Sequence, residues 1–346
     1  MWAGRRVLVT GHTGFKGTWL VALLNRLGAE VYGYSLDSNA SNRLYSETKS
    51  SSLLKGECFQ DIRDYEKIRK YIQKVQPEFI IHMAAQSLVR KSYEEPLLTI
   101  TTNVLGTTNL ILAALSTDSV ELILNVTTDK VYRNNNSSIP FSENDNLGGD
   151  DVYSGSKAAV EVLSHAMNFS VNKKRIPLIN VRAGNVIGGG DWAEDRLIPD
   201  IVRSVNLEGK LAVRNPTFTR PWQYVLDCLN GYSTLIQYKI ENPKFVFPDA
   251  MNFGPSDSMS VREVVEIFSK RFNVSIQAPA ATDTTPEKKF LRLNSDLAEK
   301  TIGWRTVLSV YDAVDRTAAW YESYLSGIGA KQLVDNEIDW YLEKLS

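Results

Sequence analysis

Histidine and cysteine are scarce in this 346-residue chain, which has three histidines and two cysteines. His12, Cys58, His82, His165 and Cys228 are widely separated along the sequence. A structural zinc site needs about four closely spaced Cys or His ligands, and a disulfide framework needs more than one possible pair. The sequence therefore excludes both kinds of site.

Net charge and long apolar runs are also limited. The 39 basic and 40 acidic side chains leave a net charge of -1, so we expect no basic surface for nucleic acid or for an anionic membrane. No apolar stretch approaches the roughly 18 residues of a membrane span, and a strand-like run begins at once, which leaves no room for a signal peptide. We therefore expect a cytoplasmic protein whose partners are small molecules or copies of itself.

Buried strands and helical segments alternate through the first half of the chain. β-rich runs without polar alternation indicate a parallel sheet that helices cover on both faces, and such sheets bind ligands at the carboxyl ends of their strands. Gly28 follows leucines at helical spacing and is expected to end the first helix. We expect strands over 6–10, 30–36, 78–85, 121–127 and 177–183, and helices near 64–75, 97–117 and 153–170.

The second half of the chain has a different texture. Loop signals such as GGGDW, RNP and FGPSDS are mixed with shorter expected helices at 225–240, 260–272 and 309–326. The length supports about two domains, so we interpret this part as a smaller α/β domain that shapes a substrate pocket. The polar segments 50–60 and 133–150 are expected to be surface loops.

A glycine-rich segment, Gly11-His12-Thr13-Gly14-Phe15-Lys16-Gly17, stands between the first expected strand and the first expected helix. Its GxxGxxG pattern lets the backbone approach a diphosphate at the helix N-terminus, and its place in a βαβ series indicates dinucleotide binding. An acidic residue after the second strand would bind the ribose hydroxyls, whereas an arginine there would accept a 2′-phosphate. Asp37 lies slightly beyond the usual position and no arginine precedes Arg43, which favours NAD over NADP.

Tyr153 and Lys157 are four residues apart at the start of an expected helix, so both side chains project from one face. A tyrosine acts as an acid or base near neutral pH only when its phenolate is stabilised, and a nearby lysine and a positive nicotinamide both stabilise it. The polar run Thr127-Thr128-Asp129-Lys130 follows the apolar fourth strand and reaches the same crevice. The YxxxK spacing is common by chance, but with the glycine loop and this strand end it becomes specific.

With these motifs the chain resembles the extended short-chain dehydrogenase/reductases, and within them the nucleotide-sugar 4,6-dehydratases, most closely the branch acting on CDP-glucose. The similarity covers nearly the whole chain and is carried by GHTGFKGTWL (11–20), HMAAQSLVRKSY (82–93), TTDKVY (127–132), LGGDDVYSGSK (147–157), RAGNVIGGGDWAEDRLIPD (182–200) and RNPTFTRPWQYVLDCLNGY (214–232). The resemblance implies a Rossmann-type doubly wound parallel sheet with a smaller C-terminal α/β substrate domain. It places the NAD-binding domain at 1–185 plus a return segment at about 224–254, and the substrate-binding domain at about 186–223 and 255–346.

The resemblance implies a reaction in which the enzyme borrows a hydride and regenerates NAD⁺. Tyr153 takes the proton of the sugar C4 hydroxyl, while Lys157 lowers the pKa of that phenol and holds the nicotinamide ribose. Thr128 hydrogen-bonds the C4 oxygen. The C4 ketone acidifies the C5 proton, water leaves from C5 and C6, and the hydride returns to C6. By the same resemblance, Asp129 is the acid that protonates the leaving C6 hydroxyl.

Lys130 stands where the dTDP-glucose dehydratases carry a glutamate base, and a lysine there matches the CDP-glucose branch. A lysine accepts a proton only when it is neutral. Burial would lower its pKa, whereas the adjacent Asp129 would raise it. Three roles therefore stay open for Lys130: base for the C5 proton, electrostatic stabiliser of the enolate, or partner in a structural ion pair.

The resemblance also assigns binding residues. The cofactor is expected to contact Gly11, Thr13, Gly14, Phe15, Gly17, Asp37, Asp61, Ile62, Ala84, Ala85, Asn103, Tyr153 and Lys157. The nucleotide diphosphate hexose is expected to contact Gln86, Ser87, Arg90, Asn185, Arg196, Arg214 and Arg220. Arginine suits a diphosphate because its fork makes paired charge-assisted hydrogen bonds, although a surface salt bridge is the alternative for each arginine.

Helices 97–117 and 153–170 are apolar along one face, as in dimerising members of that family, which implies a homodimer or homotetramer. Ordinary core packing explains the same pattern. A nucleotide-sugar 4-epimerase is an alternative function, but it needs no acid to expel a hydroxyl, so Asp129 and Lys130 argue against it. A catalytically silent dinucleotide sensor would lack Tyr153 or Lys157, and both are present. Guanine or thymine remain alternatives to cytosine as the nucleobase.

Overall fold

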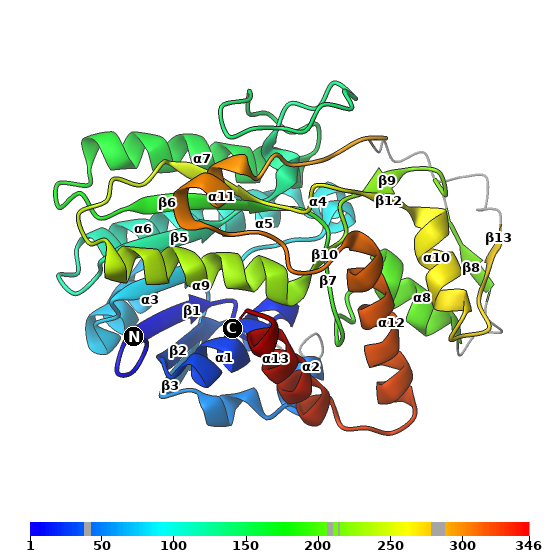
Figure 1. Cartoon of the computed structure of the whole chain (residues 1–346). Helices are drawn as coiled ribbons and strands as arrows, with labels where there is room; N and C mark the ends of the chain where they lie inside the picture. Colours follow the sequence, from blue (N-terminus) through cyan, green and yellow to red (C-terminus); the bar gives the residue numbers. More distant parts are fainter. Residues whose placement is uncertain (38–42, 206–209, 214, 278–287, 346) are drawn as a thin grey trace.

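A seven-stranded parallel sheet forms the centre of the computed structural model, which describes residues 1–37, 43–205, 210–213, 215–277 and 288–345 (Figure 1). The strand order is β11-β6-β5-β4-β1-β2-β3, and winding reverses between β1 and β4, as in a Rossmann-type sheet. The predicted fold class is therefore confirmed. The strands are β1 (Arg6–Thr10), β2 (Glu30–Ser35), β3 (Gly56–Phe59), β4 (Phe79–His82), β5 (Leu122–Val126), β6 (Leu178–Ala183) and β11 (Ala250–Phe253).

Helices cover both faces of the sheet (Figure 1). One face carries α1 (Phe15–Leu27), α9 (Val225–Glu241) and α13 (Ala330–Leu345), and the other carries α3 (Tyr65–Val75), α5 (Pro96–Ile100), the π-helical turn η2 (Thr101–Leu105), α6 (Gly106–Leu115) and α7 (Val152–Ser170). Successive strand side chains point to opposite faces: Val7 and Val9 join one apolar core and Leu8 joins the other. Burial on both faces explains why these strands lack polar alternation.

The first βαβ unit folds as its sequence predicts. β1 leads through the glycine loop into α1, and Gly28 ends α1 in the left-handed conformation with a φ of 95°. The Gly28 amide donates to the carbonyl of Asn25 at 2.9 Å, which satisfies an otherwise unpaired helix-end carbonyl. β2 then pairs with β1 in parallel, from Glu30 beside Arg6 to Tyr34 beside Thr10.

Most of the remaining elements gather at one end of the sheet, whereas α11 (Asp296–Ile302) packs against β11 and α9 (Figure 1). The remaining elements are α2 (Arg43–Glu47), α4 (Val89–Glu94), η3 (Asp129–Val131), β7 (Val186–Ile187), α8 (Leu197–Val205), β8 (Lys210–Ala212), β9 (Thr219–Arg220), β10 (Gln223–Tyr224), β12 (Met259–Ser260), α10 (Val261–Ser269), β13 (Ser275–Gln277), α11 and α12 (Val310–Leu325). β7 pairs with β10, β9 with β12, and β8 with β13. The division of the chain into two domains at the predicted boundaries remains a proposal.

Two expectations need correction. Segment 50–60 is not simply a loop, because it contains η1 (Ser50–Leu53) and the edge strand β3. The sequence hides β3 because an edge strand needs no long apolar run. The stretch Pro96–Leu115 is also long and apolar enough to cross a membrane by length and composition, although we expected none. Half of its apolar part is buried against the rest of the chain.

Candidate active site

A cavity of about 1040 Å³ opens beside the carboxyl ends of the central strands. Its wall joins the glycine loop, the polar run after β5, the start of α7, and segments from the second half of the chain. The two motifs found in the sequence therefore face the same space. The predicted residues on this wall are Gly11, Thr13, Gly14, Phe15, Gly17, Asp61, Ile62, Ala84, Ala85, Ser87, Arg90, Thr128, Asp129, Lys130, Tyr153, Lys157, Asn185, Arg196 and Arg220.

Close backbone packing explains two of the three loop glycines. Gly11 has a φ of 70°, and a Cβ there would lie 2.9 Å from the amide nitrogen of Ala84. A Cβ at Gly17 would lie 2.2 Å from the Gly11 carbonyl oxygen. Gly14 is the N-cap of α1 and provides no side-chain hydrogen bond, so the first amides of the helix remain available to a diphosphate.

The wall beyond the loop fits a dinucleotide. The Thr13 and Ser35 hydroxyls are 2.8 Å apart and join the glycine loop to the end of β2. Asp61 and Ile62 line the cavity farther along the sheet edge. The structure does not bring Asp37 to this wall; its side chain is exposed two residues beyond β2. Its contact with the ribose remains a prediction.

The start of α7 holds Tyr153 and Lys157 in place. Asp151 caps this helix by accepting a hydrogen bond from the Ser154 amide at 2.8 Å. Tyr153 and Lys157 are both buried on the inner face of the helix. The Lys157 ammonium donates to the carbonyl oxygen of Val126 at 3.0 Å, which ties the helix to the last residue of β5.

Burial opposes ionisation of both side chains. It raises the pKa of the Tyr153 phenol to about 12, although a hydrogen bond with Thr128 and the positive charge of Arg196 act in the opposite direction. Burial lowers the pKa of Lys157 to about 8, with a further reduction from the charge of Lys16. The pair is therefore poised for proton transfer only when further positive charge stabilises the phenolate.

Asp129 has the environment of an acid. Its side chain is buried, and its Oδ2 has no hydrogen-bond partner among the described residues. A Cβ at Gly184 would lie 2.8 Å from that oxygen, so glycine is needed for this close approach. Burial raises the pKa of Asp129, against the lowering effects of the Lys130 charge and the Thr128 hydrogen bond. The carboxyl thus retains its proton to higher pH than an exposed aspartate.

Replacement of Lys157 by methionine is expected to stabilise the cofactor-free protein at pH 7 while it removes activity. Since the folded pKa is about 8 against 10.5 for an unperturbed lysine, the buried charge costs roughly 3 kcal/mol below pH 8. Loss of the Val126 hydrogen bond returns about 1 kcal/mol of that gain. Urea unfolding at pH 7 should therefore give a free energy about 2 kcal/mol larger for Lys157→Met.

The sign of this effect depends on pH. Lysine is charged in both states below the folded pKa of about 8 and neutral in both above the unperturbed value of 10.5, so the advantage of Lys157→Met should disappear as pH rises through that window. The exposed Lys344 provides a control, because Lys344→Met should change little at either pH. An unchanged advantage at high pH would contradict the explanation.

Ion pairs hold two predicted substrate arginines at the cavity. Arg90 pairs with Asp195 at 2.7 Å, and Arg196 pairs with Asp191 at 3.0 Å. Arg220 is buried on the same wall, where its charge lowers the pKa of Asp129. The predicted contact of Arg214 lies outside the described residues.

Gln86 and Asn103 are not on the wall but behind it. Asn103 is fully buried within the π-helical turn η2. Its side-chain amide donates to the Gln86 carbonyl at 3.0 Å and to the Ser156 hydroxyl at 2.9 Å, and its oxygen accepts from the Gln86 amide at 2.8 Å. Asn103 thus holds the segment after β4 against α7, and a ligand contact for Gln86 or Asn103 remains a prediction.

Lys16 is a wall residue that the sequence did not reveal as functional. Its ammonium lies 5.8 Å from the centre of the Tyr232 ring, and burial lowers its pKa. The available signal was a basic residue between two glycines of the loop. That sequence pattern alone does not distinguish a lysine that lines a cavity from a lysine that is exposed to solvent.

Comparisons with known proteins agree with this geometry. Residues 8–317 match the family model described as GDP-mannose 4,6 dehydratase. The chain is 38% identical over 335 residues to CDP-glucose 4,6-dehydratase of Salmonella typhimurium, covering 94% of this chain and 93% of that enzyme. It is 26% identical over 344 residues to UDP-glucuronate 4-epimerase 4 of Arabidopsis thaliana, covering 94% and 77%.

A solved structure has the same fold. The dTDP-glucose 4,6-dehydratase of Streptomyces venezuelae, with NAD bound, superposes with a TM-score of 0.78 at 23% identity and covers 93% of this chain and 98% of its own. At this identity the likeness concerns the fold alone.

Proposed function

We propose a mechanism from the premise that the chain belongs to the GDP-mannose 4,6-dehydratase family and is an NAD-dependent nucleotide-sugar 4,6-dehydratase. Its substrate is CDP-glucose and its product CDP-4-keto-6-deoxyglucose. One observation supports this proposal: Asp129 and Lys130, which we propose for elimination, line the same cavity as Tyr153 and Lys157, which we propose for oxidation.

We assign oxidation at C4 to Thr128, which lies two residues beyond β5, and to Tyr153 and Lys157 on α7. Tyr153 accepts the proton of the C4 hydroxyl, and Thr128 hydrogen-bonds the C4 oxygen. Lys157 stabilises the phenolate electrostatically, which offsets the burial that raises the pKa of Tyr153 to about 12. NAD held by the glycine loop would supply a nicotinamide able to accept a hydride from C4 and return it to C6.

Elimination of water uses Asp129 and Lys130, the two residues that follow Thr128. The C4 ketone acidifies the C5 proton, which Lys130 removes in its neutral form. Asp129 donates its proton to the departing C6 hydroxyl, so water leaves. The raised pKa of Asp129 supports this role, because the carboxyl must be protonated before it can act as an acid.

The same cavity contains the groups proposed to bind the nucleotide sugar. Asn185, Arg196 and Arg220 line it from the segments that follow β6, and Ser87 and Arg90 line it from the segment after β4. The arginines suit the diphosphate because guanidinium groups pair with its oxygens. Arg214 is proposed as a further ligand from the sequence alone.

A 4-epimerase is the less supported function. Identity to the dehydratase exceeds identity to the epimerase over a similar length. An epimerase would also have no use for an acid at Asp129, whose buried Oδ2 has no hydrogen-bond partner in the described part of the chain.

The function is tested by incubating the purified chain with CDP-, dTDP-, GDP- and UDP-hexoses. We expect CDP-glucose to yield a 4-keto-6-deoxy sugar without net formation of NADH. Product from a different nucleotide would move the substrate assignment to that nucleotide. Epimers alone, or no turnover of any sugar, would overturn the dehydratase assignment.

A homodimer is proposed from the outer faces of α5–α6 and α7, while a homotetramer remains the alternative. These faces expose the large apolar side chains Leu97, Ile100, Leu105, Val162 and Phe169. Pairing of both faces across a two-fold axis would bury them in a four-helix bundle. Sedimentation velocity should give an oligomer for the natural chain and a monomer for Val162→Asp/Phe169→Asp. A monomeric natural chain would contradict this proposal. Binding of nucleic acid or of membranes would contradict the expected role as a cytoplasmic protein that binds small molecules.

A further inference from the structure

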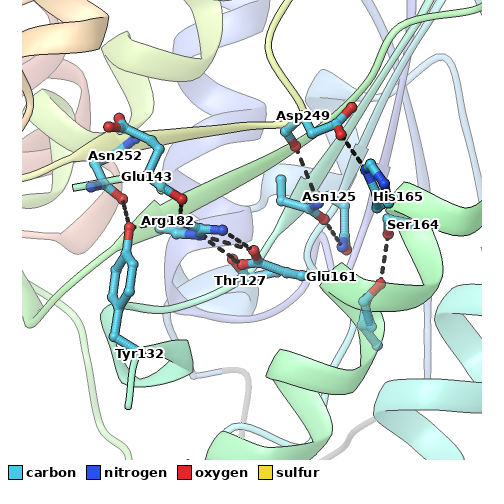
Figure 2. Close-up of polar contacts among 12 residues, drawn as sticks. Asn125, Thr127, Tyr132, Glu143, Glu161, Ser164, His165, Arg182, Asp249 and Asn252 are labelled. Atoms are coloured by element: carbon cyan, nitrogen blue, oxygen red, sulfur yellow. Dashed lines mark hydrogen bonds and ion pairs between the residues drawn. The ribbon is translucent and has the colours of Figure 1, made fainter. Parts of the chain in front are cut away.

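Two hydroxyl side chains enclose the proposed catalytic segment 128–130. Thr127 directly precedes it, and Tyr132 follows it after one residue. The Thr127 hydroxyl donates to Glu161 Oε1 at 2.5 Å, and the Arg182 guanidinium donates to the Tyr132 hydroxyl at 2.6 Å (Figure 2). The N-terminal end of the segment is thus held by Glu161, and its C-terminal end is held by Arg182.

Glu161 and Arg182 form a buried ion pair beneath the cavity. Their side chains are 2% and 4% exposed, and neither lines the cavity. Arg182 Nε donates to the two carboxylate oxygens of Glu161 at 3.1 and 2.9 Å, and its Nη2 makes a further contact (Figure 2). Glu161 lies one helical turn after Lys157 on α7, and Arg182 lies on β6. The pair therefore joins the catalytic helix to the sheet.

A second set of hydrogen bonds extends the network to β11. The Tyr132 hydroxyl donates to Asn252 Oδ1 at 2.7 Å, and the Asn252 side-chain amide donates to the Phe141 carbonyl at 3.0 Å. Arg182 Nη1 also donates to the Glu143 carbonyl at 3.0 Å, while Glu143 Oε1 accepts from the Asn252 backbone amide at 2.8 Å (Figure 2). Tyr132 is therefore fixed from two sides.

We propose that Glu161 and Arg182 are positioning residues for the dehydratase reaction. They hold both ends of segment 128–130 and, through α7, fix its position relative to Lys157. The inference rests on the proposed function of that segment. A displacement of about 1 Å at a reacting group costs up to about a hundredfold in rate, so a rigid support matters even though neither ion touches the substrate.

The test removes the two ties and leaves the ion pair intact. Loss of Glu161 or Arg182 would leave a buried charge unpaired and endanger folding, whereas Thr127→Val and Tyr132→Phe preserve side-chain shape. For each variant we expect kcat with CDP-glucose to fall about tenfold and KM to stay within about twofold. Reduced nicotinamide should accumulate during single turnovers, because elimination slows more than C4 oxidation. The double variant should lose less than the product of the two single losses, because both ties restrain one segment.

Thr317→Val is the matched control. Thr317 is a buried threonine on α12 whose hydroxyl donates to the Ala313 carbonyl at 2.7 Å, outside the cavity wall. It should reproduce any loss of melting temperature without the kinetic signature. Unchanged kcat in both test variants, or a loss that only parallels the folded fraction as in the control, would overturn the inference. If the natural chain turns over no nucleotide hexose, the proposed function fails instead.

Discussion

Tyr153→Phe is expected to reduce the rate of C4 oxidation by about a thousandfold or more, because general base catalysis contributes a factor on the order of 10² to 10⁴. Among the described residues of α7, no second tyrosine could replace Tyr153 as the base. Binding of the nucleotide sugar should remain within a few-fold, since the phenylalanine ring preserves the buried shape. Stopped-flow measurement of nicotinamide reduction with CDP-glucose, together with calorimetric titration, would separate the two quantities.

The pH dependence gives this prediction a second readout. Burial raises the pKa of Tyr153 to about 12, so the phenol is protonated near neutrality unless bound charges stabilise its anion. The base must be deprotonated, and the oxidation rate of the natural chain should therefore fall as pH decreases. The residual rate of Tyr153→Phe should lack this dependence. Tyr311→Phe, at an exposed position on α12, controls for the loss of a tyrosine hydroxyl. Equal pH profiles for Tyr153→Phe and the natural chain would contradict the role of Tyr153 as the base.

Buried strands and helix ends were the parts of the fold that the sequence predicted well. Strands such as β1 and β5 are mostly apolar because both of their faces are covered, and Gly28 ends α1 because the backbone there is left-handed. β3 was missed because a short, half-exposed edge strand leaves no such pattern. Local composition thus identifies elements that are buried on both sides better than those at an edge.

The candidate site was predictable where its residues lie close together in sequence. Tyr153 with Lys157, and Thr128 with its two neighbours, are fixed by one helix and one strand end, so their spacing carries information. The Glu161-Arg182 pair was not predicted, because its members come from α7 and β6 and meet only in the folded chain. Asn103 was expected at the cofactor, yet its amide is used within the protein to hold Gln86. Partners distant in sequence leave no local signal.

Lys130→Met is expected to permit C4 oxidation and to abolish release of the 4-keto-6-deoxy sugar. The variant keeps Tyr153, Lys157 and Thr128, so reduced nicotinamide should form with CDP-glucose. It removes the proposed base, so C5 should exchange no hydrogen with deuterated solvent and water should not leave. Mass spectrometry of the sugar and stopped-flow absorbance measure the two steps separately. Full product formation by this variant would exclude a catalytic role for Lys130.

Two companion variants separate the roles that remain open for Lys130. Lys130→Arg keeps the positive charge, but an arginine does not become neutral in a protein and so cannot act as a base. The Lys130→Arg variant should therefore be inactive if Lys130 is the base. It should be active if Lys130 only stabilises the enolate. Asp129→Asn removes the acid instead, and C5 exchange should then persist while expulsion of the C6 hydroxyl fails. If Lys130 served only in a structural ion pair, Lys130→Met would lower the free energy of unfolding but leave kcat per folded molecule unchanged. Because the Lys130 charge lowers the pKa of Asp129, Lys130→Met should shift the alkaline limb of any remaining elimination, where Asp129 loses its proton, upward in pH. Lys130→Arg keeps the positive charge and should show no such shift.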